Sequence, residues 1–189
     1  MTGRLIGGIN HGGHGSALGG SVSSVVKKLI KNKTINTSFF DGGATVTADG
    51  NTMYFVSEQN AEKSQSDIYI VEKIGNKWGK AVALQASINS KGRETTPYIT
   101  PDGKYLFFSS NGLIGMGDYD VYVVEKMGTS WGEPKNLGIR VNSVNNDTHF
   151  KFYENLGKAY MTGLEVVGDK ASMDIYEIEI SLEELVKGL

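Results

Sequence analysis

Three acidic residues recur at one position of a repeating pattern, and they are the first candidates for chemistry in this sequence. Asp41, Glu94 and Asp147 are each 53 residues apart. Side chains at equivalent positions of a repeat gather on one face, where a set of carboxylates would attract a cationic group. In the alternative interpretation each carboxylate is structural and accepts hydrogen bonds from nearby backbone groups. The residues themselves leave both interpretations open.

Histidine provides little further chemistry. His149 follows two residues after Asp147, and no Ser or Cys nucleophile stands at motif spacing from it, so we predict no catalytic triad and no catalytic residues. We group His149 with the three acids as candidate ligand-binding residues. His11 and His14 lie in a Gly-rich stretch without neighbouring Asp, Glu or Cys, which indicates a flexible lead rather than a metal site.

A second set of acids precedes the third strand that we expect in each repeat: Asp67, Asp120 and Asp174. Aspartate at such a position usually accepts hydrogen bonds from the nearby backbone. A calcium loop would need alternating oxygen ligands, and Asp118 together with Asp120 is the nearest approach to that pattern. We favour the turn-capping role, and we predict neither a metal nor a cofactor.

The composition limits the class of protein. A chain of 189 residues suits one domain with its own core, and a net charge of −2 gives no reason to expect nucleic acid as a partner. The absence of Cys excludes disulfides, thiolate metal sites and a Cys nucleophile. The apolar runs are too short to span a membrane, and residues 1–20 lack the basic start and apolar middle of a signal peptide.

The elements that position the acids repeat with the same period. An Asp-Gly turn at 49–50 returns at 102–103, and then as Asn-Leu-Gly at 155–157 with one residue inserted. An aromatic strand follows each turn, at 53–55, 106–108 and 160–162. We expect the first two turns to join the inner two strands of each unit. A 53-residue period of strand signals predicts four-stranded units, and a propeller fits this pattern best.

The ends of the chain depart from the repeat. Trp78 and Trp131 open the outer strands of the first two units, where we predict equivalent buried positions rather than sugar-stacking platforms. The third unit lacks this Trp, and the Ser-x-x-Glu spacing at 181–184 predicts a short helix. We expect a Gly-rich lead with an outer strand over 1–34, repeats over 35–180 and a helix over 181–189.

The segment Thr-Pro-Asp-Gly-Lys-Tyr-Leu-Phe-Phe-Ser-Ser at 100–110, with Asp-Val-Tyr at 120–122, resembles the WD-like propeller repeat of the TolB type. This repeat also occurs in OmpA-family bacterial envelope proteins. The join from Trp131 to Ser143 is typical of the same family. The resemblance covers about residues 35–180 and is weakest in the third repeat. It implies an all-β propeller that serves as an interaction platform in the periplasm or cell envelope.

These observations predict a non-catalytic β-propeller module that binds a protein or an envelope glycan. The contact is expected at the mouth that carries Asp41, Glu94, Asp147 and His149. The alternative is a propeller-fold hydrolase or the propeller domain of a peptidase. Because three blades do not close a propeller, we expect further blades, a second copy making a homodimer, or pairing of Val25 to Ile30 with the third unit.

Overall fold

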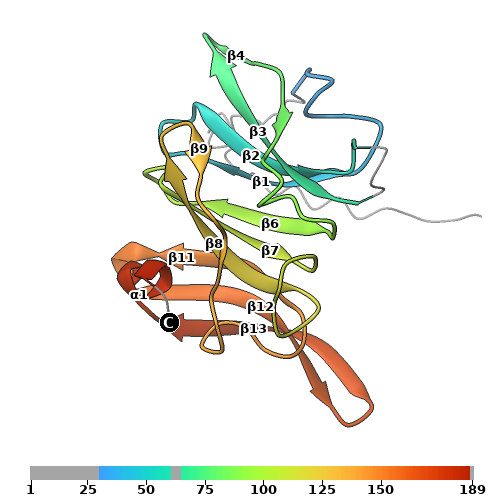
Figure 1. The fold of residues 1–189 in the computed structure, drawn as a ribbon, viewed down its shortest axis with the longest axis vertical. Coiled ribbons are helices and arrows are strands. Elements are labelled where there is room, and N and C mark those ends of the chain that lie inside the picture. Colours follow the sequence, from blue (N-terminus) through green and yellow to red (C-terminus); the bar gives the residue numbers. More distant parts are fainter. Residues whose placement is uncertain (1–29, 61–64, 188–189) are drawn as a thin grey trace, which may run out of the picture.

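The computed structural model describes residues 30–60 and 65–187, which form three antiparallel sheets arranged as successive blades of an open arc (Figure 1). Blade 1 contains β1 (Asp41–Val46), β2 (Thr52–Ser57), β3 (Asp67–Ile74), β4 (Lys77–Trp78) and β5 (Val82–Ala83). Blade 2 contains β6 (Glu94–Ile99), β7 (Tyr105–Ser110), β8 (Asp120–Met127), β9 (Ser130–Trp131) and β10 (Lys135–Asn136). Blade 3 contains β11 (Asp147–Tyr153), the 3₁₀ turn η1 (Glu154–Leu156), β12 (Lys158–Val167) and β13 (Lys170–Glu179), and α1 (Leu182–Lys187) follows it.

The all-β fold of propeller blades with a short C-terminal helix is confirmed, with one change to the blades. The expected outer strand is split into two short pieces in blades 1 and 2, and blade 3 has three strands. No helix within the described ranges is long and apolar enough to cross a membrane.

The turns between the inner two strands follow from their residues. Gly103 adopts a φ of +73° and donates its N–H to the carbonyl of Thr100 at 2.8 Å, while Asp102 accepts the Thr100 hydroxyl at 2.6 Å. The same turn forms at 49–50, so the predicted Asp-Gly turns are confirmed in both blades. In blade 3 the left-handed residue is Gly157, which has a φ of +60°.

Strand pairing corrects the alignment of the third repeat. Tyr54, Phe107 and Tyr160 occupy one equivalent position, because they pair with Thr45, Tyr98 and Lys151 respectively. The third turn therefore contains no inserted residue, and its aromatic strand corresponds to 159–161 rather than 160–162.

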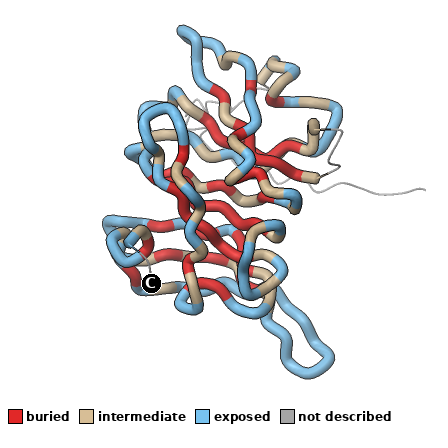
Figure 2. The backbone as a smooth tube through the Cα atoms, in the orientation of Figure 1, coloured by how far each residue is buried: buried red, intermediate tan, exposed pale blue. Residues whose placement is uncertain are grey.

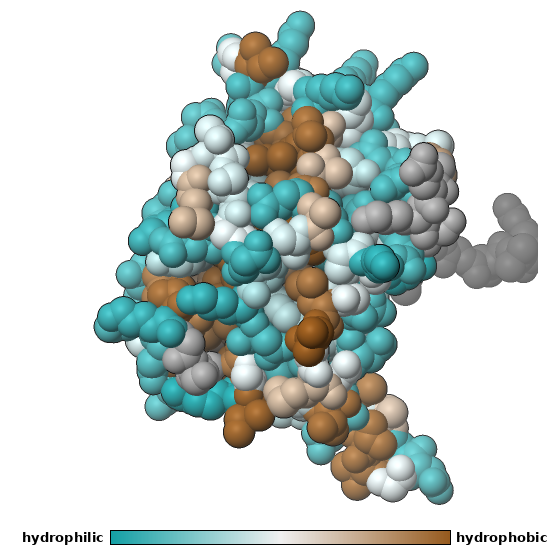
Figure 3. All heavy atoms as spheres, in the orientation of Figure 1, coloured by the Kyte–Doolittle hydropathy of each residue, from teal (hydrophilic) through white to brown (hydrophobic). Residues whose placement is uncertain are grey.

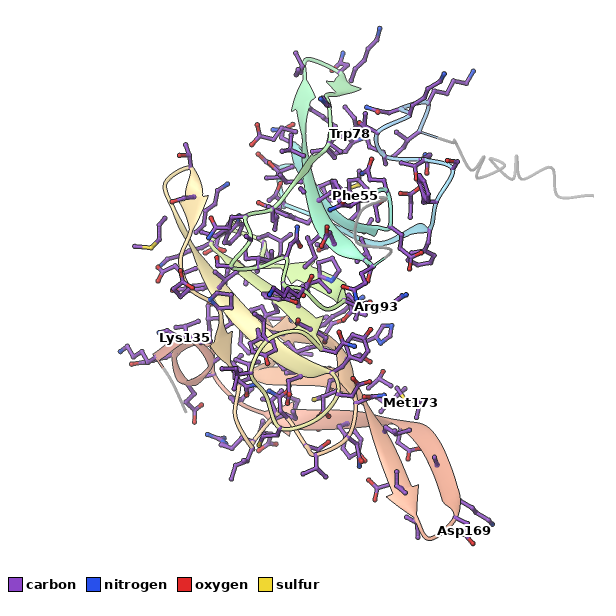
Figure 4. The ribbon with its side chains drawn as sticks, turned by 45° about the vertical axis from the view of Figure 1, so that its right-hand side comes forward. Phe55, Trp78, Arg93, Lys135, Asp169 and Met173 are labelled. Carbon is purple, nitrogen blue, oxygen red and sulfur yellow. The ribbon has the colours of Figure 1, made fainter. Side chains whose placement is uncertain are left out.

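The extra residue lies in the hairpin of β12 and β13. Ala159 pairs with Ile178 whereas the equivalent Leu106 pairs with Val124, a difference of one residue. This long hairpin replaces the polar loops that join β2 to β3 and β7 to β8, and Asp169 marks its tip (Figure 4). Asp174 consequently lies within β13 rather than before a strand, so its predicted turn-capping position is wrong.

The buried residues lie mainly in the strands of the three sheets (Figure 2), and their apolar side chains form layers between successive blades. Between blades 1 and 2, the layer includes Tyr54, Ile68, Leu106 and Phe108. Between blades 2 and 3, the equivalent layer includes Phe107, Val121, Phe152 and Met161. Successive side chains of each strand thus pack alternately into the layers on its two sides, which is why these strands are apolar throughout.

The two tryptophans differ in burial. Trp131 is 8% exposed, and its ring meets Tyr54 edge-on with centroids 5.8 Å apart. Trp78 is half-buried at the end of the arc, where Lys73 Nζ lies 5.0 Å from its ring centroid (Figure 4). The predicted equality of burial is wrong because, among the described residues, no blade precedes blade 1 to cover Trp78.

Helix α1 takes the place of the Trp hairpin in blade 3. Leu185 lies 54 residues after Trp131, the spacing that the strands of blade 3 require, and is 2% exposed in the layer between blades 2 and 3. The Ser181 hydroxyl accepts the Glu184 N–H at 3.2 Å, and the Glu184 carboxylate accepts the Ser181 N–H at 2.8 Å. The predicted capping box is therefore confirmed.

We expect Leu185→Ala to lower the free energy of unfolding by about 2–5 kcal/mol, the usual cost of deleting a buried leucine side chain. Urea denaturation of the variant and the parent measures this loss. Lys187→Ala, on the exposed side of the same helix, serves as the control and should change stability by less than about 0.5 kcal/mol. Equal stability of the Leu185 variant and the parent would show that α1 does not seal the core.

The outward face of blade 3 differs in chemistry from that of blade 2. Tyr105, Phe107 and Val123 of blade 2 pack against blade 3. The equivalent side chains of blade 3 are Lys158, Tyr160 and Glu177. Lys158 Nζ lies 2.6 Å from Glu177 Oε1, and the Tyr160 hydroxyl donates to Glu177 Oε2 at 2.5 Å. This face therefore carries an ion pair where the other blades carry an apolar layer.

The two ends of the arc lie far apart (Figure 1). Most of the segment from Val25 to Ile30 is outside the described residues, but Ile30 itself packs against the core of blade 1. Within 30–60 and 65–187, no strand pairs with the outer edge of β13.

Candidate functional site

The three repeated acids are the first residues of the innermost strands β1, β6 and β11, so they lie at one end of the arc's inner strands. In blade 1, Asp41 Oδ2 accepts the N–H of Thr37 at 2.7 Å and its hydroxyl at 2.8 Å. Asp41 Oδ1 accepts the hydroxyl of Ser57 at 2.6 Å. We call this arrangement the hydroxyl clamp: one hydroxyl comes from four residues before the acid, and another from the end of the neighbouring strand.

Glu94 lies in the same clamp in blade 2. Its Oε1 accepts the hydroxyls of Ser90 at 2.5 Å and Ser110 at 2.7 Å, whereas its Oε2 is buried without a hydrogen-bond partner. Loss of hydration, together with the negative charge of Asp67, raises the pKa of Glu94 to about 7. Because Glu94 is fully buried, it meets no solvent in this structure.

Asp147 has only one of the two hydroxyl groups of the clamp. Ser143 donates its N–H at 2.6 Å and its hydroxyl at 2.9 Å to Asp147 Oδ2. The strand position that supplies Ser57 and Ser110 in blades 1 and 2 is Gly163 in blade 3. No hydroxyl from the described residues therefore reaches Asp147 Oδ1, and burial raises the pKa of this carboxyl group.

The missing hydroxyl coincides with a cavity of about 270 Å³ that Asp147 and Gly163 line. Its walls come from the connection between blades 2 and 3 and from the β12–β13 hairpin, and include Arg140, Asn145 and Leu164. Tyr176 and Glu165 also line it, and the Tyr176 hydroxyl donates to Glu165 at 2.8 Å. Asp147 is 3% exposed, so its uncommitted carboxylate oxygen lies at the floor of the cavity, where it can accept a hydrogen bond from an N–H or ammonium group.

The hairpin beside this cavity projects from the molecule and carries exposed apolar side chains (Figure 3). The large ones among them are Val166, Val167, Met173, Ile175 and Tyr176. The surface around the Asp147 cavity is therefore mixed, with a polar floor and an apolar projection.

His149 lies on the same strand at a β-bulge. Its φ is +58°, and the equivalent Thr96 and Gly43 have φ values of +47° and +58°. Such a conformation costs about 1–3 kcal/mol for a residue with a side chain, so the backbone is strained at Thr96 in blade 2 and at His149 in blade 3. The His149 N–H donates to Thr96 Oγ1 at 3.1 Å, which links the two blades. Partial burial and the charge of Lys151 lower the pKa of His149, which favours a neutral imidazole.

The structure brings the four predicted site residues to one end of the inner strands without bringing their side chains into one pocket. Asp147 borders a cavity, His149 is exposed at the bulge, and Glu94 is enclosed. Asp41 is half-buried within its clamp. Gly163, which takes the place of the clamp serine and lies against the Tyr176 ring, was missed because the sequence alignment of the third repeat was shifted by one residue.

The second set of acids has local partners. Asp120 Oδ2 accepts the N–H groups of Met116 at 2.8 Å and Gly117 at 3.1 Å, which confirms the predicted turn-capping role for this residue. The Asp118 carboxylate accepts the side-chain amide of Asn111 at 3.4 Å. Within 30–60 and 65–187, no group of three or more His, Asp or Glu side chains is placed to hold a metal ion.

Comparison with known proteins supports the fold. No family model and no curated protein matches the chain. Among solved structures, the chain is similar to a protein assigned as TolB from Agrobacterium tumefaciens, with a TM-score of 0.52 and 17% identity over 77% of this chain and 47% of that one.

The chain is also similar to an endo-arabinase from Bacteroides thetaiotaomicron, with a TM-score of 0.51 and 18% identity over 84% of this chain and 61% of that one. The chain thus spans less than two thirds of the length of either structure. Identities this low are informative about the fold alone. The chain has the β-propeller blade fold of the TolB type.

Proposed function

We propose that this protein is a non-catalytic interaction module that binds a protein or a cell-envelope component. The contact lies at the mouth, which we define as the end of β1, β6 and β11 that carries Asp41, Glu94, Asp147 and His149. The observation that supports this most is the difference between the acids. Asp147 has an oxygen without a partner beside a cavity, whereas both oxygens of Asp41 accept hydroxyl groups and the free oxygen of Glu94 is enclosed.

The chemistry of the Asp147 cavity favours a ligand that donates a hydrogen bond. A carboxylate oxygen binds an N–H or ammonium group through a charge-assisted bond, which is stronger than a neutral one. His149 is exposed two residues further along β11 and would contact the same ligand from the rim. The exposed Val166 and Val167 of the hairpin add apolar area beside it.

The positions of the carboxyl groups favour binding over hydrolysis. A glycoside hydrolase needs two carboxyl groups on opposite sides of the bond that it cleaves. In the Asp147 cavity the other carboxylates are Glu165, which already accepts the Tyr176 hydroxyl, and Glu177, which is paired with Lys158 and accepts the Tyr160 hydroxyl. Glu94 has a pKa near neutrality but is fully buried. The hydrolase alternative therefore rests on the fold of the arabinase alone.

We also propose the periplasm or cell envelope as the place of action, on the basis of the TolB-type fold. Completion of the ring by further blades or by a second copy stays a prediction, which the mass of the protein in solution tests. Cell fractionation of the native host tests the location.

Site-specific photo-crosslinking in the native host tests the proposed function. A benzoylphenylalanine placed at Ile139, which is 84% exposed and lines the Asp147 cavity, should give a discrete cross-linked product. The same group at Ile74, which is 77% exposed on blade 1, should not give this product. Asp147→Asn should abolish the Ile139 product, because it removes the charge from the open oxygen.

Asp41→Asn is the matched control, since this acid lies in the same clamp with its hydroxyl groups complete. It should leave the Ile139 product unchanged. Identical products from both crosslinker positions, or a product that survives Asp147→Asn, would contradict binding at the mouth. Hydrolysis of arabinan by the purified protein that is lost in Asp147→Asn would replace the binding role with the hydrolase alternative.

A further inference from the structure

A second cavity lies at the opposite end of the inner strands, between the turns of blades 2 and 3. Its volume is about 690 Å³. Aromatic and apolar side chains form most of its wall, and one carboxylate comes from each turn. The residues that matter for its chemistry are Tyr98, Pro101, Asp102, Phe152, Tyr153 and Glu154.

A single residue difference explains why the turns stay apart here. At the junction of blades 1 and 2, the Ala48 N–H donates to the Pro101 carbonyl at 3.1 Å and joins the two turns. The residue equivalent to Ala48 in blade 2 is Pro101, which has no N–H. The corresponding bond from Pro101 to Glu154 cannot form, so the second junction lacks this closure.

A second difference lies at the same junction. Thr45 of blade 1 accepts the Ile99 N–H on its hydroxyl at 3.3 Å across the first junction. The equivalent residue in blade 2 is Tyr98, whose hydroxyl donates to the Phe152 carbonyl at 2.6 Å across the second junction. The longer Tyr98 side chain reaches across the junction and lines the cavity.

The cavity is acidic. Asp102 and Glu154 line the same cavity as Tyr98. Burial raises the pKa of the Tyr98 hydroxyl, and the charges of these two carboxylates add to this effect. Burial of Asp102 opposes its ionisation, but the Thr100 hydroxyl and Lys104 lower its pKa overall. The Lys104 ammonium lies 3.5 Å from Glu125, and no Lys or Arg side chain from the described residues lines the cavity.

We propose that this cavity binds the cationic side chain of an arginine or lysine from a partner polypeptide. Asp102 and Glu154 supply charge-assisted acceptors from two sides. Tyr98 and Tyr153 supply aromatic faces that attract a cation. Phe152 gives the cavity an apolar surface for the stem of the side chain. A neutral sugar would leave both carboxylates without a counter-charge.

This cavity is separate from the mouth that we propose as the main contact, although β11 reaches both. Asp147 begins the strand at the mouth, and Tyr153 ends it at the second cavity. A partner that extends along β11 would contact both places. The test below nevertheless reports on the second cavity alone, because none of its variants alters Asp147 or the residues around it.

The test uses NMR titration of the ¹⁵N-labelled full chain with the peptide acetyl-Ala-Arg-Ala-amide. The comparison peptide carries citrulline, an uncharged isostere of arginine. We expect saturable shifts at the amides of Tyr153 and Asn155 with the arginine peptide, and at least tenfold weaker binding of the citrulline peptide. Raising the salt concentration should weaken the binding of the arginine peptide, because solvent ions can reach the carboxylates and screen their charge.

Glu154→Gln and Asp102→Asn should each weaken binding of the arginine peptide by about tenfold, the effect of losing one charge-assisted bond. Asp49→Asn is the matched control. Asp49 accepts the Thr47 hydroxyl and the Asn51 N–H, as Asp102 does from Thr100 and Lys104, but its turn is joined to the next blade. It should leave binding unchanged.

Pro101→Ala tests the cavity without changing its charge, since it restores an N–H that can close the second junction. We expect weaker binding in this variant. Equal affinity for the arginine and citrulline peptides, or full affinity in Glu154→Gln with its spectrum otherwise preserved, would overturn the proposal. Shifts at Tyr153 caused by arabinotriose but not by the arginine peptide would assign the cavity to a sugar and overturn it as well.

Discussion

Replacing Trp131 with Ala is expected to lower the free energy of unfolding by about 3–5 kcal/mol, the usual loss for a large aromatic removed from a core. Trp131 fills the layer between blades 1 and 2 and meets Tyr54 edge-on. The Gln85 amide fixes its backbone, donating to the Trp131 carbonyl at 3.0 Å and accepting the Trp131 N–H at 3.2 Å. The indole therefore joins two blades as well as filling space.

Trp78→Ala is the matched comparison and should cost about half as much or less, because a half-buried side chain loses less burial on truncation. Guanidinium denaturation of both variants, followed by circular dichroism, measures the two losses. Equal losses would indicate that Trp78 is covered in solution by a part of the chain or by a partner. A Trp131 variant as stable as the parent would contradict the layered core.

Glu94→Gln is expected to remove most of the dependence of stability on pH between about 5 and 7. The folded protein holds the Glu94 proton up to a pKa of about 7, whereas the unfolded chain releases it near the ordinary value of 4.5. The unfolded state therefore binds fewer protons in this range, and stability falls as the pH rises. A difference of this size corresponds to about 3 kcal/mol.

Urea denaturation at pH 5 and pH 8 tests this expectation. The parent should be less stable at pH 8 than at pH 5, and Glu94→Gln should show a smaller difference, because its amide keeps an oxygen for Ser90 and Ser110 and carries no charge. Glu133→Gln, at an exposed carboxylate, is the control and should retain the dependence of the parent. A variant with the full dependence of the parent would show that another group is responsible.

Local features were predictable from the sequence because their partners lie within a few residues. The turn at Asp102-Gly103, the cap at Asp120 and the box formed by Ser181 and Glu184 all depend on short-range hydrogen bonds. The number of blades followed from the 53-residue period. Each of these predictions depends only on residues that are close together in the sequence or on the period of the repeat.

Features that depend on contacts between blades were not predictable in the same way. Gly163 matters because it faces Asp147 across a strand pair, and Pro101 matters because a bond to the next turn is missing. Leu185 replaces Trp131 although the two residues stand on different kinds of secondary structure. The exposure of Trp78 likewise reflects what lies beside blade 1 rather than its own sequence motif.

The ion pair of Lys158 and Glu177 on the outward face of blade 3 has a consequence for the evolution and redesign of the array. A repeat duplicated beside this face would bury both charges, and the loss of their hydration is costly unless new partners compensate it. The outward face of blade 3 is thus less suited to a further blade of the same sequence than the corresponding face of blade 2. A designed fourth blade beside blade 3 would first need Lys158→Tyr and Glu177→Val, the residues that blade 2 uses at the same positions.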